Sequence, residues 1–272
     1  MAAVSTAAFI ESHRNSTDAE LARALVETAG GLALSMRDDG LETGQKSSVS
    51  DVVTNADTAA EEFVAGALEA LRPEDGIVGE EGAEKTSASG RTWVIDPVDG
   101  TYNFASGSDY FCSALALVEG DVREPARILT SAIHRPALAT TWVAEDGTAT
   151  RNGYKLEPLI DAPLPHLALA TYLHPTSMTD DGIRNAWLRA TNSAATVRMF
   201  GAGSIDLATV ASGGIGGWLQ HSVADWDWLP GKALVEAAGG KAVKVSAGGV
   251  TWCVAGNHQL VGELVAKLEQ HG

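Results

Sequence analysis

Basic residues are scarce in this chain. Its 272 residues include 35 aspartates and glutamates but only 19 lysines and arginines, so the formal net charge is −16. Surfaces that bind nucleic acid or anionic membranes carry basic patches, because they must neutralise phosphate groups. The charge balance therefore predicts that neither nucleic acid nor a membrane is a partner.

Long apolar runs, paired cysteines and metal-binding histidine motifs are also missing. No run reaches the ~18 apolar residues of a membrane-spanning helix, and the N-terminus carries no basic segment followed by a long apolar core. The two cysteines, Cys112 and Cys253, lie in separate apolar runs and are expected to be reduced core residues. The seven histidines show no HxH or HExxH spacing. A soluble, cytoplasmic protein without a zinc site is expected.

Apolar residues make up 45% of the chain and recur with helical and strand periodicity in turn. Hairpins are expected within 128–153, and the proline-rich stretch 156–166 is the best candidate for a boundary between two lobes. Helices are predicted at 5–36, 58–71, 180–191, 204–213, 227–238 and 259–270. Strands are predicted at 77–78, 92–97, 110–121, 167–173, 196–200, 217–220 and 251–256.

The stretch WVIDPVDGTYNF, residues 93–104, places Asp96 and Asp99 after an apolar strand, on either side of Pro97. Two carboxylates this close repel each other, and a bound cation is the usual compensation. Pro97 restricts the backbone, so the turn can direct both carboxylates to one side, and the carbonyl of Val98 adds another oxygen. Oxygen ligands of this kind suit Mg²⁺, although each acid taken alone also fits a turn or a helix cap. Three more acids stand at the ends of predicted elements: Asp57, Glu80 and Asp227.

Gly100 and Thr101 follow Asp99 and offer backbone N–H groups at the start of a helix or in a tight turn. Unsatisfied amides in such a position attract phosphate. A metal pair beside a phosphate nest is the arrangement that in-line displacement at phosphorus uses. The alternative interpretation of this Asp-Gly-Thr sequence is a simple β-turn.

The same residues carry a family resemblance. WVIDPVDGTYNF resembles the first signature of the inositol monophosphatase family, the Mg²⁺-dependent, lithium-sensitive sugar and nucleotide phosphatases, and WDWLPGKALVEAAGG is similar to its second signature. VVTNADTAAEEF and GIVGEEG match the upstream segments of the family, so the likeness spans residues 46–240. It implies an α/β fold, a layered αβαβα sandwich of the inositol monophosphatase/fructose-bisphosphatase type. An α+β half at 1–155 would carry most metal ligands, and an α/β half at 156–272 would complete the site.

The resemblance assigns roles to the matching residues. Thr101 and Asp57 would orient and deprotonate the attacking water, with Glu80 as the third catalytic residue. The amides of Gly100 and Thr101 would bind the phosphate. The implied reaction is direct attack of metal-activated water on phosphorus, without a phosphoenzyme. Two to three Mg²⁺ ions would be held by Glu80, Asp96, Val98 through its carbonyl, Asp99, Asp227 and, for a weaker third ion, Asp57.

Departures from the family pattern leave the substrate open. Gln220 stands where inositol-cleaving relatives carry a glutamate, and a neutral amide can pair with hydroxyls but carries no charge. Leu229-Pro230 replaces two small residues of the second signature. Residues expected to bind the substrate are Gly201, Ala202 and Gly203, which resemble the turn at the sugar pocket, with Gln220 and Asp227.

An inositol monophosphate such as myo-inositol 1-phosphate is the first expectation for the substrate, and the relatives suggest a homodimer. The alternatives are histidinol phosphate, for whose amine Asp225 is a candidate partner, fructose 1,6-bisphosphate and 3′-phosphoadenosine nucleotides. A function of another class, a non-catalytic binding or regulatory protein on this fold, is disfavoured by the intact acids. Lys46 is a candidate neighbour of the metal-bound water, Trp228 a candidate for the pocket wall, and the glycine-rich stretch 211–217 is expected only to turn the chain.

Overall fold

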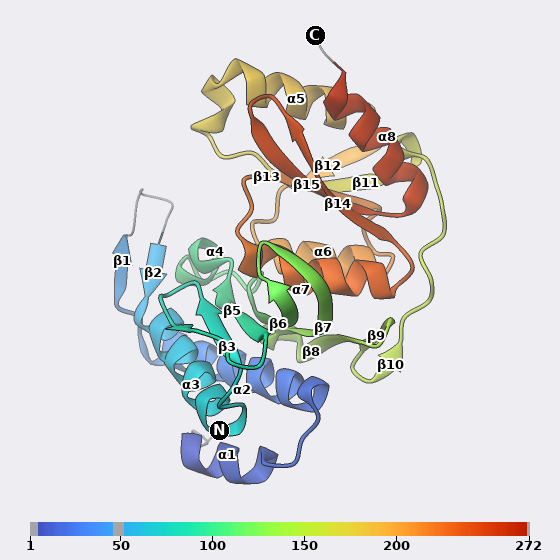
Figure 1. Ribbon diagram of the computed structural model, residues 1–272. Helices are drawn as coiled ribbons and strands as arrows, with labels where there is room; N and C mark the ends of the chain where they lie inside the picture. Colours follow the sequence, from blue (N-terminus) through green and yellow to red (C-terminus); the bar gives the residue numbers. More distant parts are fainter. Residues whose placement is uncertain (1–4, 46–51, 271–272) are drawn as a thin grey trace.

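Two sheets and three layers of helices make up most of the computed structural model, which describes residues 5–45 and 52–270 (Figure 1). The larger sheet has the strand order β10-β9-β8-β7-β6-β5-β3-β4, with β3 (Gly76–Gly79), β4 (Glu84–Lys85), β5 (Arg91–Asp99), β6 (Cys112–Asp121), β7 (Glu124–Arg135), β8 (Thr140–Glu145), β9 (Thr148–Arg151) and β10 (Tyr154–Lys155). The smaller sheet has the order β12-β11-β13-β15-β14, with β11 (Ala168–Tyr172), β12 (Thr196–Arg198), β13 (Gly217–His221), β14 (Lys241–Ala247) and β15 (Val250–Gly256). A separate antiparallel pair is formed by β1 (Thr43–Gln45) and β2 (Val52–Thr54).

Helices cover the outer faces of both sheets and fill the space between them (Figure 1). The outer face of the larger sheet is covered by α1 (Thr6–His13), α2 (Asp18–Asp39) and α3 (Asn55–Leu71). Between the sheets lie α6 (Gly203–Ala211) and α7 (Asp225–Ala237), and the smaller sheet is covered by α5 (Asp181–Thr191) and α8 (His258–Glu269). Short helices complete the chain: α4 (Thr101–Ala105) after β5, and single 3₁₀ turns at Pro136–Leu138, Leu164–His166 and Ser177–Thr179. The layered αβαβα sandwich expected from the sequence is confirmed.

Strand β5 is buried along almost its whole length. It pairs parallel with β3 and antiparallel with β6, and helices cover both of its faces. Trp93 and Ile95 pack in the core beneath α2 and α3, whereas Val94 packs in the core against α6 and α7. Because side chains alternate along a strand, Asp96 points to the same face as Val94, towards α7.

Several element boundaries differ from the sequence predictions. The single helix predicted at 5–36 is wrong: α1 and α2 are separated, and Thr17 begins α2 with a capping box to Glu20, which favours a new helix start. The helix α7 begins at Asp225, upstream of the predicted start, so Pro230 lies inside the helix instead of in its first turn. Strand β14, whose sequence KAVKVSA alternates between polar and apolar residues, was not predicted.

Residues 76–155 supply the larger sheet and residues 168–256 the smaller one. The division into halves at 1–155 and 156–272 remains a proposal, in which α6 and α7 of the second half pack on the sheet of the first. Cys112 and Cys253 are buried and free, as expected. Within the described ranges, the structure contains no helix with the length and apolar character needed to cross a membrane.

Candidate metal centre and active site

Strand β5 ends in a β-bulge that carries two of the predicted ligands. The pairing of β5 with β6 shifts register between Asp96 and Asp99. Pro97, between them, has no N–H to give to the ladder and so tolerates the irregularity, and its carbonyl accepts a hydrogen bond of 2.6 Å from the hydroxyl of Ser113. A bulge redirects side chains, which allows two acids so close in sequence to face one site.

Asp96, Asp99 and Asp227 converge, and one carboxylate oxygen from each lies within 4.8 Å of those of the other two. Asp227 lies in the first turn of α7, where the helix dipole favours an acid. Glu80 follows β3, the parallel neighbour of β5, and lies close enough to Asp96 for its negative charge to raise the pKa of Asp96. The structure therefore brings together four predicted residues that are far apart in the sequence.

Asp96 is the least compensated of these acids. It is 1% exposed, and neither carboxylate oxygen accepts a hydrogen bond from any residue that the structure describes. Burial raises the pKa of Asp96 well above its usual range, and the three neighbouring carboxylates raise this pKa further. Buried charges in proteins are normally paired or coordinate a metal. The donor set around Asp96, made of carboxylate oxygens, fits a hard divalent cation.

Asp99 links this cluster to the start of α6. Helix α6 begins after Ala202 without a side-chain cap, and the amide of Ser204 donates a hydrogen bond to Oδ2 of Asp99 instead. Burial raises the pKa of Asp99, and the hydrogen bonds from Ser204 and from the Gly203 amide oppose that rise. The first turn of α6, predicted to contact the substrate, is thereby fixed against the acidic cluster.

Asp57 and Thr101 form a second polar pair beside the cluster. Asp57 is buried in the first turn of α3, where its Oδ2 accepts a hydrogen bond of 3.0 Å from the amide of Thr54. The hydroxyl of Thr101 lies 3.0 Å from Oδ1 of Asp57 and 3.0 Å from the carbonyl of Val98. Burial raises the pKa of Asp57, although the hydrogen bonds to its carboxylate oppose the rise. A carboxylate that can accept a proton is thus connected to a hydroxyl.

The backbone of Gly100 permits α4 to approach the turn before α6. Its φ is +89°, and a Cβ there would lie 3.0 Å from the Cβ of Ala202 and 3.1 Å from the carbonyl oxygen of Gly201. Across the same contact, the side-chain amide of Asn103 donates to the carbonyl of Phe200 at 2.7 Å. The predicted phosphate-binding and substrate-binding turns therefore lie side by side.

A cavity of about 720 Å³ opens beside the acidic cluster and unites most of the predicted residues. The predicted residues that line it are Glu80, Asp99, Gly100, Thr101, Gly201, Ala202, Gly203, Gln220 and Asp227. The rest of the wall was not predicted from the sequence; it includes Tyr172, His174, Met199, Phe200, Asp206 and Trp218. Tyr172 could have been predicted, because it stands near the end of a predicted strand, as Gln220 does. The two strands, β11 and β13, pair in parallel, and the ends of parallel strands meet at one edge of a sheet. Tyr172 and Gln220 are register partners there.

Two residues singled out in the sequence do not line the cavity. Asp225 forms an ion pair of 3.1 Å with Lys244 and does not line the cavity, which disfavours it as a partner of a substrate amine. Trp228 is buried and stacks on Trp218 with 5.8 Å between ring centroids, and Trp218 is the one that lines the cavity. Lys46 lies outside the described residues.

Asp206 is a buried acid of the cavity wall that the sequence did not single out. Its Oδ1 accepts a hydrogen bond of 2.6 Å from the hydroxyl of Tyr110. Burial raises the pKa of Asp206 to about 7 against the effect of that hydrogen bond. Asp206 therefore ties α6 to the segment that enters β6.

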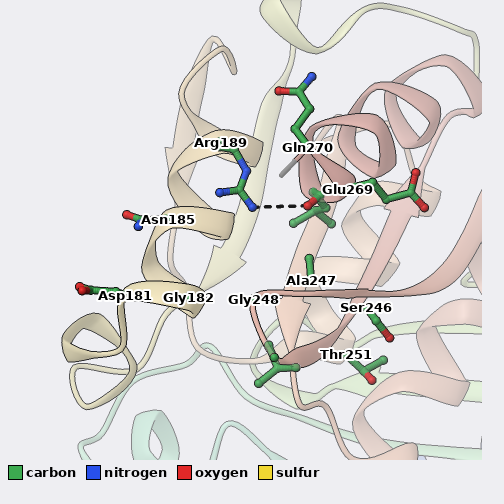
Figure 2. Close-up of a pocket in the computed structure, with 13 residues that line it drawn as sticks. Asp181, Gly182, Asn185, Arg189, Ser246, Ala247, Gly248, Thr251, Glu269 and Gln270 are labelled. Atoms are coloured by element: carbon green, nitrogen blue, oxygen red, sulfur yellow. Dashed lines mark hydrogen bonds between the residues drawn. The ribbon is translucent and has the colours of Figure 1, made fainter. Parts of the chain in front are cut away.

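A larger hollow of about 1200 Å³ lies between α5, α8 and the turn from β14 to β15 (Figure 2). The guanidinium of Arg189 donates to the carbonyls of Lys267 and Leu268, at 3.3 and 3.4 Å, and so caps the end of α8. The two acids that line the hollow, Asp181 and Glu269, lie on opposite sides of it and do not converge (Figure 2). Size alone would favour this hollow, but the smaller cavity holds the converging carboxylates and is the candidate active site.

The layered fold and the acidic cluster are those expected of the metal-dependent phosphatases that the sequence resembles. The chain belongs to the inositol monophosphatase family, whose sequence pattern matches residues 14–271. It is 31% identical over 202 residues to inositol-1-monophosphatase of Rhizobium meliloti (strain 1021), which covers 73% of this chain and 74% of that protein. It is 32% identical over 200 residues to histidinol-phosphatase of Mycobacterium tuberculosis (strain ATCC 25618 / H37Rv), with 70% and 72% covered. The crystal structure of extragenic suppressor protein suhB from Bartonella henselae is similar with a TM-score of 0.79 and 26% identity, covering 92% and 97% of the two chains.

Proposed function

We propose that this protein is a Mg²⁺-dependent phosphomonoesterase that hydrolyses a small phosphorylated alcohol, with myo-inositol 1-phosphate as the first candidate substrate. The observation that carries the proposal is Asp96, a buried carboxylate that receives no hydrogen bond from the described residues and lies beside three further acids. Such a group is stable only when it is protonated or when a cation neutralises it. Oxygen donors in this number suit Mg²⁺.

Six residues would hold two to three ions: Glu80, Asp96, the carbonyl of Val98, Asp99, Asp227 and, for the weaker third ion, Asp57. Bound Mg²⁺ would supply the positive charge that an anionic substrate requires in a chain of net charge −16, and would lower the pKa of the attacking water. The acidic composition is thus compatible with a phosphorylated substrate, since the field at the site reverses when the cations are bound.

Thr101 and Asp57 would receive the proton of the attacking water. The Thr101 hydroxyl lies within hydrogen-bond distance of Oδ1 of Asp57, which leaves a lone pair of the hydroxyl to accept a hydrogen bond from water in the cavity. As water attacks phosphorus, its proton would pass to Oγ1 of Thr101 while the Thr101 proton passes to Oδ1 of Asp57. The raised pKa of the buried Asp57 favours this uptake.

The turns around the cavity would bind the substrate. Gly100 and Thr101 open α4 and line the cavity, so their amides are placed to donate to phosphate oxygens. The alcohol would lie against the backbone of Gly201, Ala202 and Gly203 and the side chain of Gln220, which line the same cavity.

Phosphate release from a substrate panel, with and without Mg²⁺, tests the proposal. The panel contains myo-inositol 1-phosphate, histidinol phosphate, fructose 1,6-bisphosphate and 3′-phosphoadenosine 5′-phosphate. Asp99→Asn removes one charge but keeps an oxygen that can accept a hydrogen bond from Ser204. We expect it to lower kcat/KM by more than ~100-fold, because ~100-fold is the upper range for residues that only orient a metal ligand. Glu124→Gln, at the exposed start of β7, is the matched control and should keep the parent rate. Equal rates for Asp99→Asn and the parent would refute the role of Asp99, and no release from any substrate would favour a non-catalytic binding protein.

Histidinol phosphate is the second candidate substrate, because the rim of the cavity is aromatic and apolar. Tyr102, Met199 and Phe200 line the cavity with 57%, 43% and 37% of their surface exposed. Tyr172 and His174 add two further rings to the wall. Exposed apolar side chains gathered at a cavity favour a ligand with a planar or apolar part, which an imidazole ring has and a fully hydroxylated ring lacks. Phe200→Ala should then lower kcat/KM for histidinol phosphate more than for myo-inositol 1-phosphate.

Three further properties belong to this proposal. We expect inhibition by lithium in the same phosphate-release assay, a homodimer in sedimentation analysis and a cytoplasmic location in cell fractionation. The first two rest on the family resemblance, and the third on the expectation drawn from the sequence before the resemblance. Each measurement decides its own point without affecting the assignment of the metal ligands.

A further inference from the structure

Glu61 lies buried on α3 and holds the turn that carries Glu80. Its Oε2 accepts a hydrogen bond of 2.8 Å from the amide of Glu81, and its Oε1 accepts one of 2.7 Å from the amide of Ala83. Both amides belong to the turn between β3 and β4, directly after Glu80. One carboxylate from a neighbouring helix thus fixes two points of this turn.

The approach of Glu61 to this turn is very close. A Cβ at Gly79, the residue before Glu80, would lie 2.4 Å from Cδ of Glu61, so only glycine leaves room for the carboxylate there. On the other side, the amide of Glu80 donates a hydrogen bond of 3.2 Å to the carbonyl of Ile95 on β5. The backbone at Glu80 is therefore fixed between α3 and β5.

The two hydrogen bonds explain why a carboxylate stands at this position. Two amide donors require two acceptor oxygens, and ionised glutamate supplies both, whereas glutamine would place an NH₂ group against one of the amides. Burying a carboxylate is costly, and charge-assisted hydrogen bonds offset that cost only when the donors stay in place. The turn must therefore be held in one arrangement, and it carries Glu80, a predicted metal ligand.

We propose that Glu61 is a positioning residue for the metal centre, which holds the Glu80 turn in the arrangement that directs Glu80 towards Asp96 before a cation binds. The inference rests on the proposed role of Glu80 as a metal ligand. A ligand that is held in place loses less conformational freedom on binding, so removal of the clamp should weaken the metal and leave the chemistry of the filled site largely intact.

Glu61→Gln tests this role, and Glu62→Gln is the matched control, because Glu62 is the exposed neighbour on the same helix. Calorimetric titration of the metal-free proteins with Mn²⁺ and Mg²⁺ should show dissociation constants raised by ~10-fold or more in Glu61→Gln and unchanged in Glu62→Gln. The Mg²⁺ concentration that half-saturates phosphate release should rise by the same factor, while kcat at saturating Mg²⁺ recovers. Hydrogen exchange at the amides of Glu81 and Ala83 should accelerate in Glu61→Gln alone.

The outcomes separate this inference from the proposed function. If the parent protein binds neither metal, the proposed metal centre is wrong. If the parent binds metal and Glu61→Gln binds it equally well, the metal centre stands and the role of Glu61 is overturned. If Glu61→Gln does not fold, Glu61→Asp keeps both oxygens but shortens their reach by one methylene, and unchanged metal affinity in that variant would overturn the role in the same way.

Discussion

The two ends of strand β5 hold buried carboxylates in opposite states. At the start of β5, Asp75 accepts hydrogen bonds from Arg91 at 2.6 Å, from Ser89 at 2.7 Å and from the indole of Trp93 at 3.0 Å. Burial alone would raise the pKa of Asp75, but these hydrogen-bond donors hold it below its usual range. At the other end, burial and neighbouring acids raise the pKa of Asp96, which has no such donors among the described residues.

The contrast teaches how a buried acid can serve structure or chemistry. The chain supplies the compensation for Asp75 itself, since Arg91 also pairs with Asp18 on α2 at 2.7 Å and so ties a helix to the sheet. For Asp96 the residues that the structure describes supply three more acids and no hydrogen-bond donor, and we propose that a bound cation compensates its charge. Substitutions at the two ends should therefore have opposite effects on the stability of the metal-free protein, and only those at Asp96 should affect metal binding.

The largest effect is expected from Asp96→Asn. The amide keeps the shape but removes the charge that would bind the cation, so kcat/KM should fall by more than ~100-fold. The metal-free variant should resist urea better than the metal-free parent, because an uncompensated buried charge has been removed. Phosphate release measures the loss of activity, calorimetric titration with Mg²⁺ measures the accompanying loss of metal affinity, and urea unfolding followed by circular dichroism measures the stability. Unchanged metal affinity would contradict the contrast between the two ends.

Asp75→Asn should have the second largest effect, and on stability alone. It leaves Trp93 without its carboxylate acceptor and removes one of the two carboxylate partners of Arg91. Breaking a buried ion pair of this kind costs about 3 kcal/mol, and we expect somewhat less here because Arg91 keeps Asp18. The free energy of unfolding, measured with urea at saturating Mg²⁺, should fall accordingly. The Mg²⁺ dissociation constant of the folded variant should equal that of the parent, and a weakened metal site would show that the two ends are not independent.

The pH dependence of stability should also separate the ends. A carboxyl whose folded pKa is raised, as at Asp96, contributes stability below its unfolded pKa of ~4 that is lost as the pH rises through the folded value. Asp75, with a lowered pKa, contributes stability above ~4 that is lost only as the pH falls through its folded value. In metal-free protein, the urea midpoint should therefore decrease from about pH 5 to about pH 8.

Saturating Mg²⁺ should remove this decrease, because the bound cation favours the ionised carboxylates. Asp96→Asn should flatten the metal-free profile as well, whereas Asp75→Asn should keep its slope. A metal-free parent whose midpoint rises steadily from about pH 5 to about pH 8 would contradict the raised pKa at the end of β5.

The smallest effect is expected from Trp93→Phe. This substitution removes one neutral donor from Asp75 and leaves both hydrogen bonds from Arg91, so the free energy of unfolding should fall by about 1–2 kcal/mol. Thermal unfolding measures it, and metal affinity should not change. A loss as large as that of Asp75→Asn would mean that packing of the indole, and not the hydrogen bond, supports this end.

Sequence patterns predicted the elements that carry the acids more reliably than the elements around them. The apolar run before Asp96 and its proline identified the end of β5, and the helical spacing after Asp57 identified α3. The break between α1 and α2 was missed because apolar periodicity continues on both sides of it, while the capping box at Thr17 decides where the second helix starts. Boundaries depend on such local competition between caps and periodicity.

The candidate site shows the same limit at the level of contacts. Asp225 and Asp206 are both aspartates near a helix start, and the sequence favoured the first as a pocket residue. In the structure, Lys244 on β14 engages Asp225, whereas Asp206 lines the cavity beneath Tyr110. No local pattern contains this information, because the deciding partners, Lys244 and Tyr110, lie 19 and 96 residues away in the sequence.

The amino-acid sequence by itself determined the family, the layered fold and the set of acids, because these follow from motifs whose residues are close together in the chain. Tertiary structure alone decided which buried carboxylate receives donors and which does not, which rings line the cavity, and that Glu61 holds the turn of Glu80. The physical reason is that burial and hydrogen bonding depend on neighbours in space, and for Asp96 those neighbours come from the turn after β3 and from α7, on either side of it in the sequence.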